Sequence, residues 1–239
     1  MNHAGKIALL IAIFGALAST LILFGAQLGI WDPATGFRLY RNYFNLIAMI
    51  ITGFGLLALI VHLFRKEKAS AVLGGVATVI GVICLAPMIS STLNPPVRSA
   101  PINDITTDTT NPPEFIVLDD TREGARTSLV YAGEEVARVQ TAAYPDIAPL
   151  ETDLSADAAF ARALEVAEDM EWEIIASDPE AHRFEATART SIFYFADDVV
   201  VVVSEQENGS LVNMRSVSRV GRSDQGVNAA RIHEFQQQF

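Results

Sequence analysis

Three long apolar runs open the chain, and none of them contains Lys, Arg, Asp or Glu. They are Ile7–Ile30, Leu46–Phe64 and Ala71–Leu93. Each run approaches or exceeds the roughly 20 residues that an α-helix needs to cross a bilayer. The pattern therefore predicts three transmembrane helices, at about 7–30, 46–64 and 71–93, within a membrane region over residues 1–93. The first run is too long for the apolar core of a cleaved signal peptide.

The pattern changes after the third run. The segment Asn94–Phe115 contains five prolines among many Ser, Thr and Asn residues. Such a composition favours extended backbone over a helix or a central strand. We therefore expect a Pro-rich linker over residues 94–114, followed by a soluble domain over residues 115–239.

Residues 115–239 alternate between strand-like and helix-like patterns. Ser155–Met170 has an apolar stripe at helical spacing and a serine that can cap its start. A last helix begins after Ser223 or Asp224 and buries Ile232, Phe235 and Phe239. Strand candidates lie in FIVL, SLVYAG, WEIIAS, HRFEATARTSIFYF, DDVVVVVSEQ and Leu211–Arg219, with an Asn208-Gly209 hairpin turn before the last. The succession predicts an α+β, helix-grip-like domain whose antiparallel sheet of about four or more strands is backed by two helices.

Five consecutive valines, Val199–Val203, make both faces of one predicted strand apolar, and Phe193–Phe195 do the same on its neighbour. Two helices cover only one face of a sheet. The second face needs a cover, for which three alternatives stay open: the segment 101–150, a partner or second copy of the chain, or a bound apolar ligand or lipid.

Charge is divided unequally between the two halves. Residues 1–100 carry seven basic and two acidic residues, whereas residues 101–239 carry ten arginines, 26 acidic residues and no lysine. This acidic half argues against nucleic-acid binding, which depends on clustered positive charge. The single cysteine, Cys84, lies in an apolar run and leaves no intramolecular disulfide to form.

Basic residues near the ends of membrane helices predict the orientation of the chain. The densest group is Arg65–Lys68, between the second and third runs, and Lys6 flanks the first run. We therefore expect a cytoplasmic N-terminus in the inner membrane of a Gram-negative bacterium. Three crossings then place the C-terminal domain in the periplasm. Glycine pairs such as Gly25/Gly29, Gly53/Gly55 and Gly74/Gly75 either allow close helix packing or are simply tolerated in membrane helices.

The stretch 214–232 concentrates four arginines and raises the question of a binding site. Read as a strand, it directs Arg215 and Arg219 to the sheet face opposite the helices, where a buried guanidinium needs a carboxylate partner. We favour structural ion pairs formed by Arg215, Arg219, Arg231, Asp104, Asp108, Asp197, Asp198 and Asp224. The alternative is an anion site at the start of the last helix, made by Arg219, Arg222, Ser223 and Asn228.

No catalytic residue, metal site or cofactor site is predicted. Asp197 and Asp198 are neighbours on a strand and point to opposite faces, so they cannot share a proton as a catalytic pair does. The four histidines are scattered over both halves without the spacing of metal ligands. The sequence favours a protein without catalytic activity.

Several motifs of the exported half occur in a fixed order, namely INDITTD and NPPEF, AYPDI, FYFADDVVVVV, and RSVSRVGRSDQGVNAARI. Together they resemble the domain-of-unknown-function 1499 family over about residues 100–239. The resemblance implies a similar domain behind a few N-terminal membrane helices. The family has no established activity, so the resemblance implies no catalytic residues.

These observations predict a membrane-anchored periplasmic interaction or accessory module of the bacterial envelope. One alternative is a lipid or apolar-ligand binder that uses the doubly apolar sheet. The second is an enzyme or binder that acts on an envelope anion through Arg219 and Arg222. The expected partners are the lipid bilayer and either another membrane or periplasmic protein or further copies of the chain, and nucleic acid is not among them.

Overall fold

The structure is a computed structural model and describes residues 3–95 and 99–239. Its described residues form two compact units, one built on the N-terminal helices and one built on a β-sheet. Residues 96–98 of the expected linker lie outside the described residues.

The first unit confirms three helices that are long and apolar enough to cross a membrane. The second of them is continuous from Pro33 to Phe64 because a short helix and a π-helical turn precede its main part. The elements of this unit are α1 (Ala4–Phe24), α2 (Pro33–Leu39), η1 (Tyr40–Phe44), α3 (Asn45–Phe64) and α4 (Lys68–Leu93).

The α2 helix was not expected, because it lies in residues 31–45, between the first two membrane helices predicted from the sequence. Its start has two local signals. Asp32 accepts a hydrogen bond from the backbone N–H of Thr35 at 3.0 Å, and Pro33 occupies the first helical position, where no N–H is needed.

Glycine brings α3 and α4 close together at some of the expected positions. A Cβ atom on Gly74 would lie 2.5 Å from the backbone nitrogen of Leu59, and one on Gly55 would lie 2.5 Å from that of Thr78. By contrast, a Cβ on Gly53 would meet nothing within 4 Å. Close packing therefore depends on particular glycines, as expected where small residues let helix backbones approach.

The second unit confirms the predicted α+β class. Its sheet has six strands in the order β1-β6-β5-β4-β3, with β2 also paired to β6, and all pairs are antiparallel. The strands are β1 (Asp104–Thr106), β2 (Leu150–Thr152), β3 (Glu173–Asp178), β4 (Arg183–Arg189), β5 (Ala196–Gln206) and β6 (Gly209–Ser218). The helices are α5 (Glu134–Ala143), α6 (Ala156–Asp169) and α7 (Val227–Gln238).

The four strands expected between the two long helices are present as β3 to β6. The first strand, β1, lies inside the segment 94–114, which was expected to be a linker. Its residues form a strand because they pair with β6 at the edge of the sheet. The sequences FIVL and SLVYAG do not form strands. Phe193 and Tyr194 also leave the strand pattern, since their φ angles are 64° and 60°.

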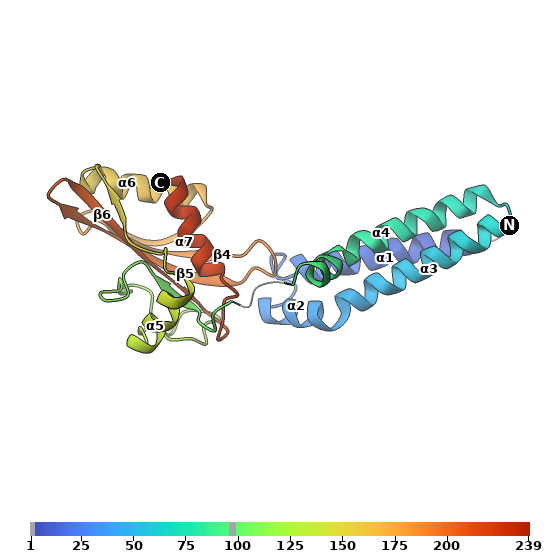
Figure 1. The fold of residues 1–239 in the computed structure, drawn as a ribbon, viewed down its shortest axis with the longest axis horizontal. Helices are drawn as coiled ribbons and strands as arrows, with labels where there is room; N and C mark the ends of the chain where they lie inside the picture. Colours follow the sequence, from blue (N-terminus) through green and yellow to red (C-terminus); the bar gives the residue numbers. More distant parts are fainter. Residues whose placement is uncertain (1–2, 96–98) are drawn as a thin grey trace. The chain divides into compact units, whose positions relative to one another are not determined.

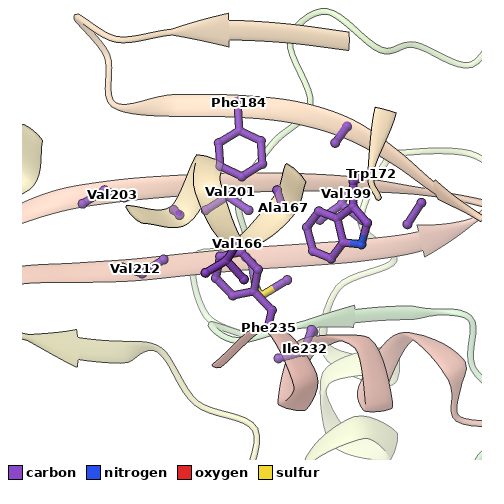
Figure 2. Packing of buried hydrophobic residues seen from close by; sticks show 14 of the residues in the cluster. Val166, Ala167, Trp172, Phe184, Val199, Val201, Val203, Val212, Ile232 and Phe235 are labelled. Atoms are coloured by element: carbon purple, nitrogen blue, oxygen red, sulfur yellow. The ribbon is translucent and has the colours of Figure 1, made fainter. Parts of the chain in front are cut away.

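The helices α6 and α7 cover one face of the sheet (Figure 1). Ser155 caps α6 by accepting the N–H of Ala158 at 3.3 Å. The core beneath the two helices takes the inward side chains of β4, β5 and β6, and Trp172 stacks on Phe235 at 5.6 Å between ring centroids (Figure 2). Alternate valines of β5, such as Val199 and Val201, point into this core.

The chain itself covers the second face of the sheet. Backbone groups of the segment 113–129 bond to the side chains that β4 and β6 direct to this face. The edge of β1 is closed by α5, because the Gln140 side-chain amide accepts from the N–H of Thr106 and donates to its carbonyl. Of the three covers considered from sequence, the structure has the first.

Candidate functional site

The arginine-rich stretch divides its side chains between the two faces of β6. Arg215 lies on the face covered by the segment 113–129, and Arg219 follows it just beyond the end of the strand. Ser216 and Ser218 point to the opposite face, toward α7. This division follows from the alternation of side chains along a strand. It produces two polar networks, one on each side of the sheet.

Arg215 is the centre of the first network and is 1% exposed. Its Nε donates to Oδ1 of Asp104 at 2.9 Å and its Nη2 donates to Oδ2 at 2.7 Å, the paired geometry that suits a guanidinium and a carboxylate. The same guanidinium donates to the carbonyls of Leu129 and Pro113. It also contacts the rings of Phe115 and Tyr131. Every nitrogen of this buried charge therefore has an acceptor.

Glu185 lies on the same face of the sheet, on β4, and is 1% exposed. Val200 of β5 lies between Glu185 and Arg215. Its carboxylate accepts the backbone N–H groups of three consecutive residues, 116–118, at distances from 2.6 to 3.2 Å. The guanidinium of Arg183, also on β4, donates to the Glu185 carboxylate at 3.2 Å. This explains why FIVL is not a strand: its N–H groups converge on one carboxylate instead of forming a ladder.

Asp198 is fully buried and binds two arginines. Arg219 donates to its carboxylate through Nε and Nη2, the latter at 2.8 Å, and Arg122 donates to Oδ2 through Nε. Thr187 links the group, because its hydroxyl donates to Asp198 and accepts from Arg219. Arg219 also donates to the carbonyl of Glu123 at 2.9 Å. The network thus fastens the covering segment to β5 and to the end of β6.

The second network lies beneath α7. Arg231 donates to Asp197 at 2.6 Å and to the hydroxyl of Ser216 at 2.9 Å. Asn228 accepts from Ser216 and Arg231 and donates to Ser218 at 3.0 Å. All five residues are buried. Asp197 therefore pairs with Arg231 on one face of the sheet, whereas Asp198 pairs with Arg122 and Arg219 on the other.

Asp108 and Asp224, which the sequence offers as ion-pair partners, bond to backbone groups instead. Asp108 accepts the N–H groups of Thr110 and Asn111, and Asp224 accepts those of Gly226 and Asn228 at the start of α7. Within the ranges 3–95 and 99–239, neither carboxylate lies in salt-bridge range of an arginine. Burial raises the pKa of Asp224, and the charge of Asp197 adds to this effect.

The structure does not gather the four residues of the anion hypothesis into a common pocket. Arg219 and Asn228 use their polar groups inside the two networks, and Ser223 donates to the carbonyl of Ala100 at 3.0 Å. Arg222 lies exposed. At the start of α7, the carboxylate of Asp224 already occupies two N–H groups, which an incoming anion would need.

No cluster of three His, Cys, Asp or Glu side chains in the described part of the chain is placed to hold a metal ion. A hollow lined by residues of β2 and of the β5–β6 hairpin opens to solvent beside Glu151, Asp153 and Glu207. It contains none of the residues of the two networks.

Comparison with known protein families gives a match over the sheet-containing unit. The family model for proteins of unknown function, DUF1499, matches residues 104–239, which is more than half of the chain. The chain belongs to the DUF1499 family. No curated protein matches it as a relative.

The DUF1499 match begins at Asp104, the partner of Arg215, and runs through α7. Both polar networks are therefore almost entirely contained in the DUF1499 region. The side chains of these networks come from β1, β4, β5, β6, α7 and the covering segment.

Arg122, Glu185 and Gln140 were not expected from the sequence to take part in these contacts. Glu185 had a signal, because Arg183, Glu185 and Thr187 alternate with apolar residues along β4 and so share the face of Arg215. Arg122 had no such signal in the sequence, because it lies in an acidic loop whose path depends on contacts with distant residues.

Proposed function

We propose that this DUF1499 protein is a membrane-anchored interaction module of the bacterial envelope, without catalytic activity. Three apolar helices suit an anchor, and the positive charge around Arg65–Lys68 favours a cytoplasmic N-terminus and a periplasmic domain. One observation carries the proposal: the buried charged groups of the domain point inward, where other parts of the same chain satisfy them.

Charged groups that serve a reaction need access to a substrate. In this domain, Arg215, Glu185 and Asp198 are each at most 1% exposed, and each has hydrogen-bond partners from the covering segment. Such groups stabilise a particular arrangement of loops. A surface held in a fixed arrangement is what a recognition module needs, because less conformational entropy is lost on binding.

The lipid-binding alternative rested on an apolar second sheet face without a cover. That face is covered by the segment 113–129, and Val200 at its centre is fully buried. We therefore favour recognition through the outer surface of the domain.

The orientation is tested with fusions after Phe239 in a Gram-negative host. We expect an alkaline phosphatase fusion to be active and a green fluorescent protein fusion to be dark. The reverse result would place the domain in the cytoplasm and refute the periplasmic assignment.

The interaction role is tested by photo-cross-linking in cells, with a photoreactive residue placed in the full chain on each exposed helix and loop of the domain. We expect at least one position to capture another protein. A scan that captures no protein at any position would refute the proposed function.

A further inference from the structure

Three aliphatic side chains lie exposed on the segments that cover the second face of the sheet. Ile116 is 69% exposed, Val117 58% and Val130 78%. We call these three residues the apolar patch. Their chain neighbours Phe115 and Tyr131 point inward, and both rings contact the guanidinium of Arg215, at 5.6 and 5.1 Å from its carbon to the ring centroids. Each part of the patch is therefore adjacent in the chain to a ring that contacts the same buried guanidinium.

The backbone beneath the apolar patch is fixed by charged side chains. Glu185 accepts the N–H groups of Ile116 and Val117, and Arg215 donates to the carbonyl of Leu129 at 2.9 Å. Asp120 joins the two segments from outside, because its carboxylate accepts the N–H of Leu129 at 2.7 Å. Exposed apolar side chains on a backbone held in this way form a preorganised binding surface.

The rim of the apolar patch is acidic. The exposed side chains next to it in the chain include Glu114, Asp119, Asp120 and Glu123, and Arg126 is the one exposed basic residue between positions 109 and 133. Hydrogen bonds from the N–H of Leu129 and the hydroxyl of Ser128 hold the pKa of Asp120 below its ordinary value. Asp120 is therefore ionised at neutral pH, with Arg122 at 3.5 Å from its carboxylate.

We propose that the apolar patch binds a segment of another protein that carries aliphatic or aromatic side chains flanked by Lys or Arg. Charge complementarity selects this partner. A second copy of the chain would bring the same four carboxylates against the first set, and a membrane surface with anionic lipids would be repelled in the same way. The inference deepens the proposed function by naming the surface and the chemistry of its partner.

The first test uses the photo-cross-linking scan of the full chain in cells. With the photoreactive residue at Val130, we expect an adduct whose captured peptide is apolar and flanked by basic residues. Ile175, on the edge strand β3, is the matched control, because it is also an exposed aliphatic residue but lies on a different element. We expect no such adduct there.

The outcomes at Val130 separate this inference from the proposed function. Lipid adducts, adducts with a second copy, or a captured peptide without basic residues would each overturn the inference. Protein adducts at other positions and none at Val130 would also overturn it, while leaving the proposed function intact. A scan without protein adducts anywhere would remove both.

The second test uses the full chain in nanodiscs of zwitterionic lipid. The probe is a short synthetic peptide that alternates leucine with lysine, and the comparison peptide has glutamate in place of lysine. We expect the lysine peptide to bind and the glutamate peptide to fail. The double variant Ile116→Ser, Val130→Ser should weaken binding by about tenfold, equivalent to about 1.4 kcal/mol, with the acidic rim unchanged.

The control variant Ile175→Ser should keep the affinity of the wild-type chain. With Trp31 replaced by Phe in every chain, the fluorescence of buried Trp172 shows whether each variant is folded. Equal affinity of the double variant and the wild type would mean that charge alone attracts the peptide. Equal binding of both peptides would mean that the rim selects nothing. Either result overturns the inference.

Discussion

Arg215 offers the sharpest test of the buried networks. The variant Arg215→Ala removes a guanidinium that is 1% exposed and leaves the Asp104 carboxylate without its bidentate partner. It also removes the bonds to the carbonyls of Leu129 and Pro113. The perturbation therefore leaves one buried charge unpaired and two carbonyls without their donors.

The expected cost follows from the geometry. Removing one partner of a buried ion pair typically costs about 3–5 kcal/mol of unfolding free energy, because the remaining charge stays desolvated. With a urea dependence of about 2 kcal/mol per molar, a loss of about 4 kcal/mol shifts the unfolding midpoint by about 2 M.

Unfolding is measured in the full chain in mild detergent. The protein has two tryptophans, Trp31 in the membrane unit and Trp172 in the core of the domain. In a Trp31→Phe background, tryptophan fluorescence therefore reports on the domain alone. The urea midpoint of Arg215→Ala is compared with that of the background chain.

A matched double variant separates an unpaired charge from a general defect. Replacing both partners, as Arg215→Met with Asp104→Leu, should recover at least half of the lost stability, because an apolar pair often substitutes for a buried ion pair. A midpoint shift below about 0.5 M for Arg215→Ala, which corresponds to about 1 kcal/mol, would refute the reasoning. So would a double variant no more stable than Arg215→Ala.

Three further predictions use the same full-length chain. Glu185→Gln should cost about 2 kcal/mol, because the amide loses the charge that binds three N–H groups, and hydrogen exchange should quicken at residues 116–118; unchanged exchange would count against this contact. The folded pKa of Asp224 is raised above the ordinary 3.8, so ionisation of this carboxyl opposes folding. The unfolding free energy of the wild type relative to Asp224→Asn should therefore fall as pH rises from about 3.8. An increase in this difference over the same pH range, measured by urea titration, would contradict the prediction. Gly74→Ala should destabilise the helix bundle by about 1–3 kcal/mol, whereas Gly53→Ala should not. The measurement is Trp31 fluorescence during SDS denaturation in a Trp172→Phe background, and equal effects of the two variants would argue against close helix packing.

The sequence predicted well what depends on local periodicity. The membrane helices, α6, α7 and the strands β3 to β6 each carry a repeat of apolar residues that fixes their type. The direction of Arg215 also followed from strand alternation, and its need for a carboxylate followed from the cost of burying a charge. Asp104 was among the candidates for that reason.

The covering segment could not be read in this way, because its conformation depends on distant residues. Residues 116–118 look like a strand, yet their N–H groups bind a carboxylate more than 60 positions later in the chain. Gln140 likewise closes the edge of β1 from a helix that the sequence did not indicate. Local composition contains no information about such pairings.

The five valines of β5 give the two acidic residues before them a further consequence. A strand of identical side chains slides by two positions against its neighbours with almost no change in packing, so Val199–Val203 alone leave the alignment of the sheet ambiguous. Asp197 and Asp198 remove the ambiguity, because a shift of any size would pull one or both carboxylates away from Arg231 and Arg219. The two ion pairs thus fix the register of β5 in the sheet, which its run of identical, aggregation-prone valines would leave undetermined.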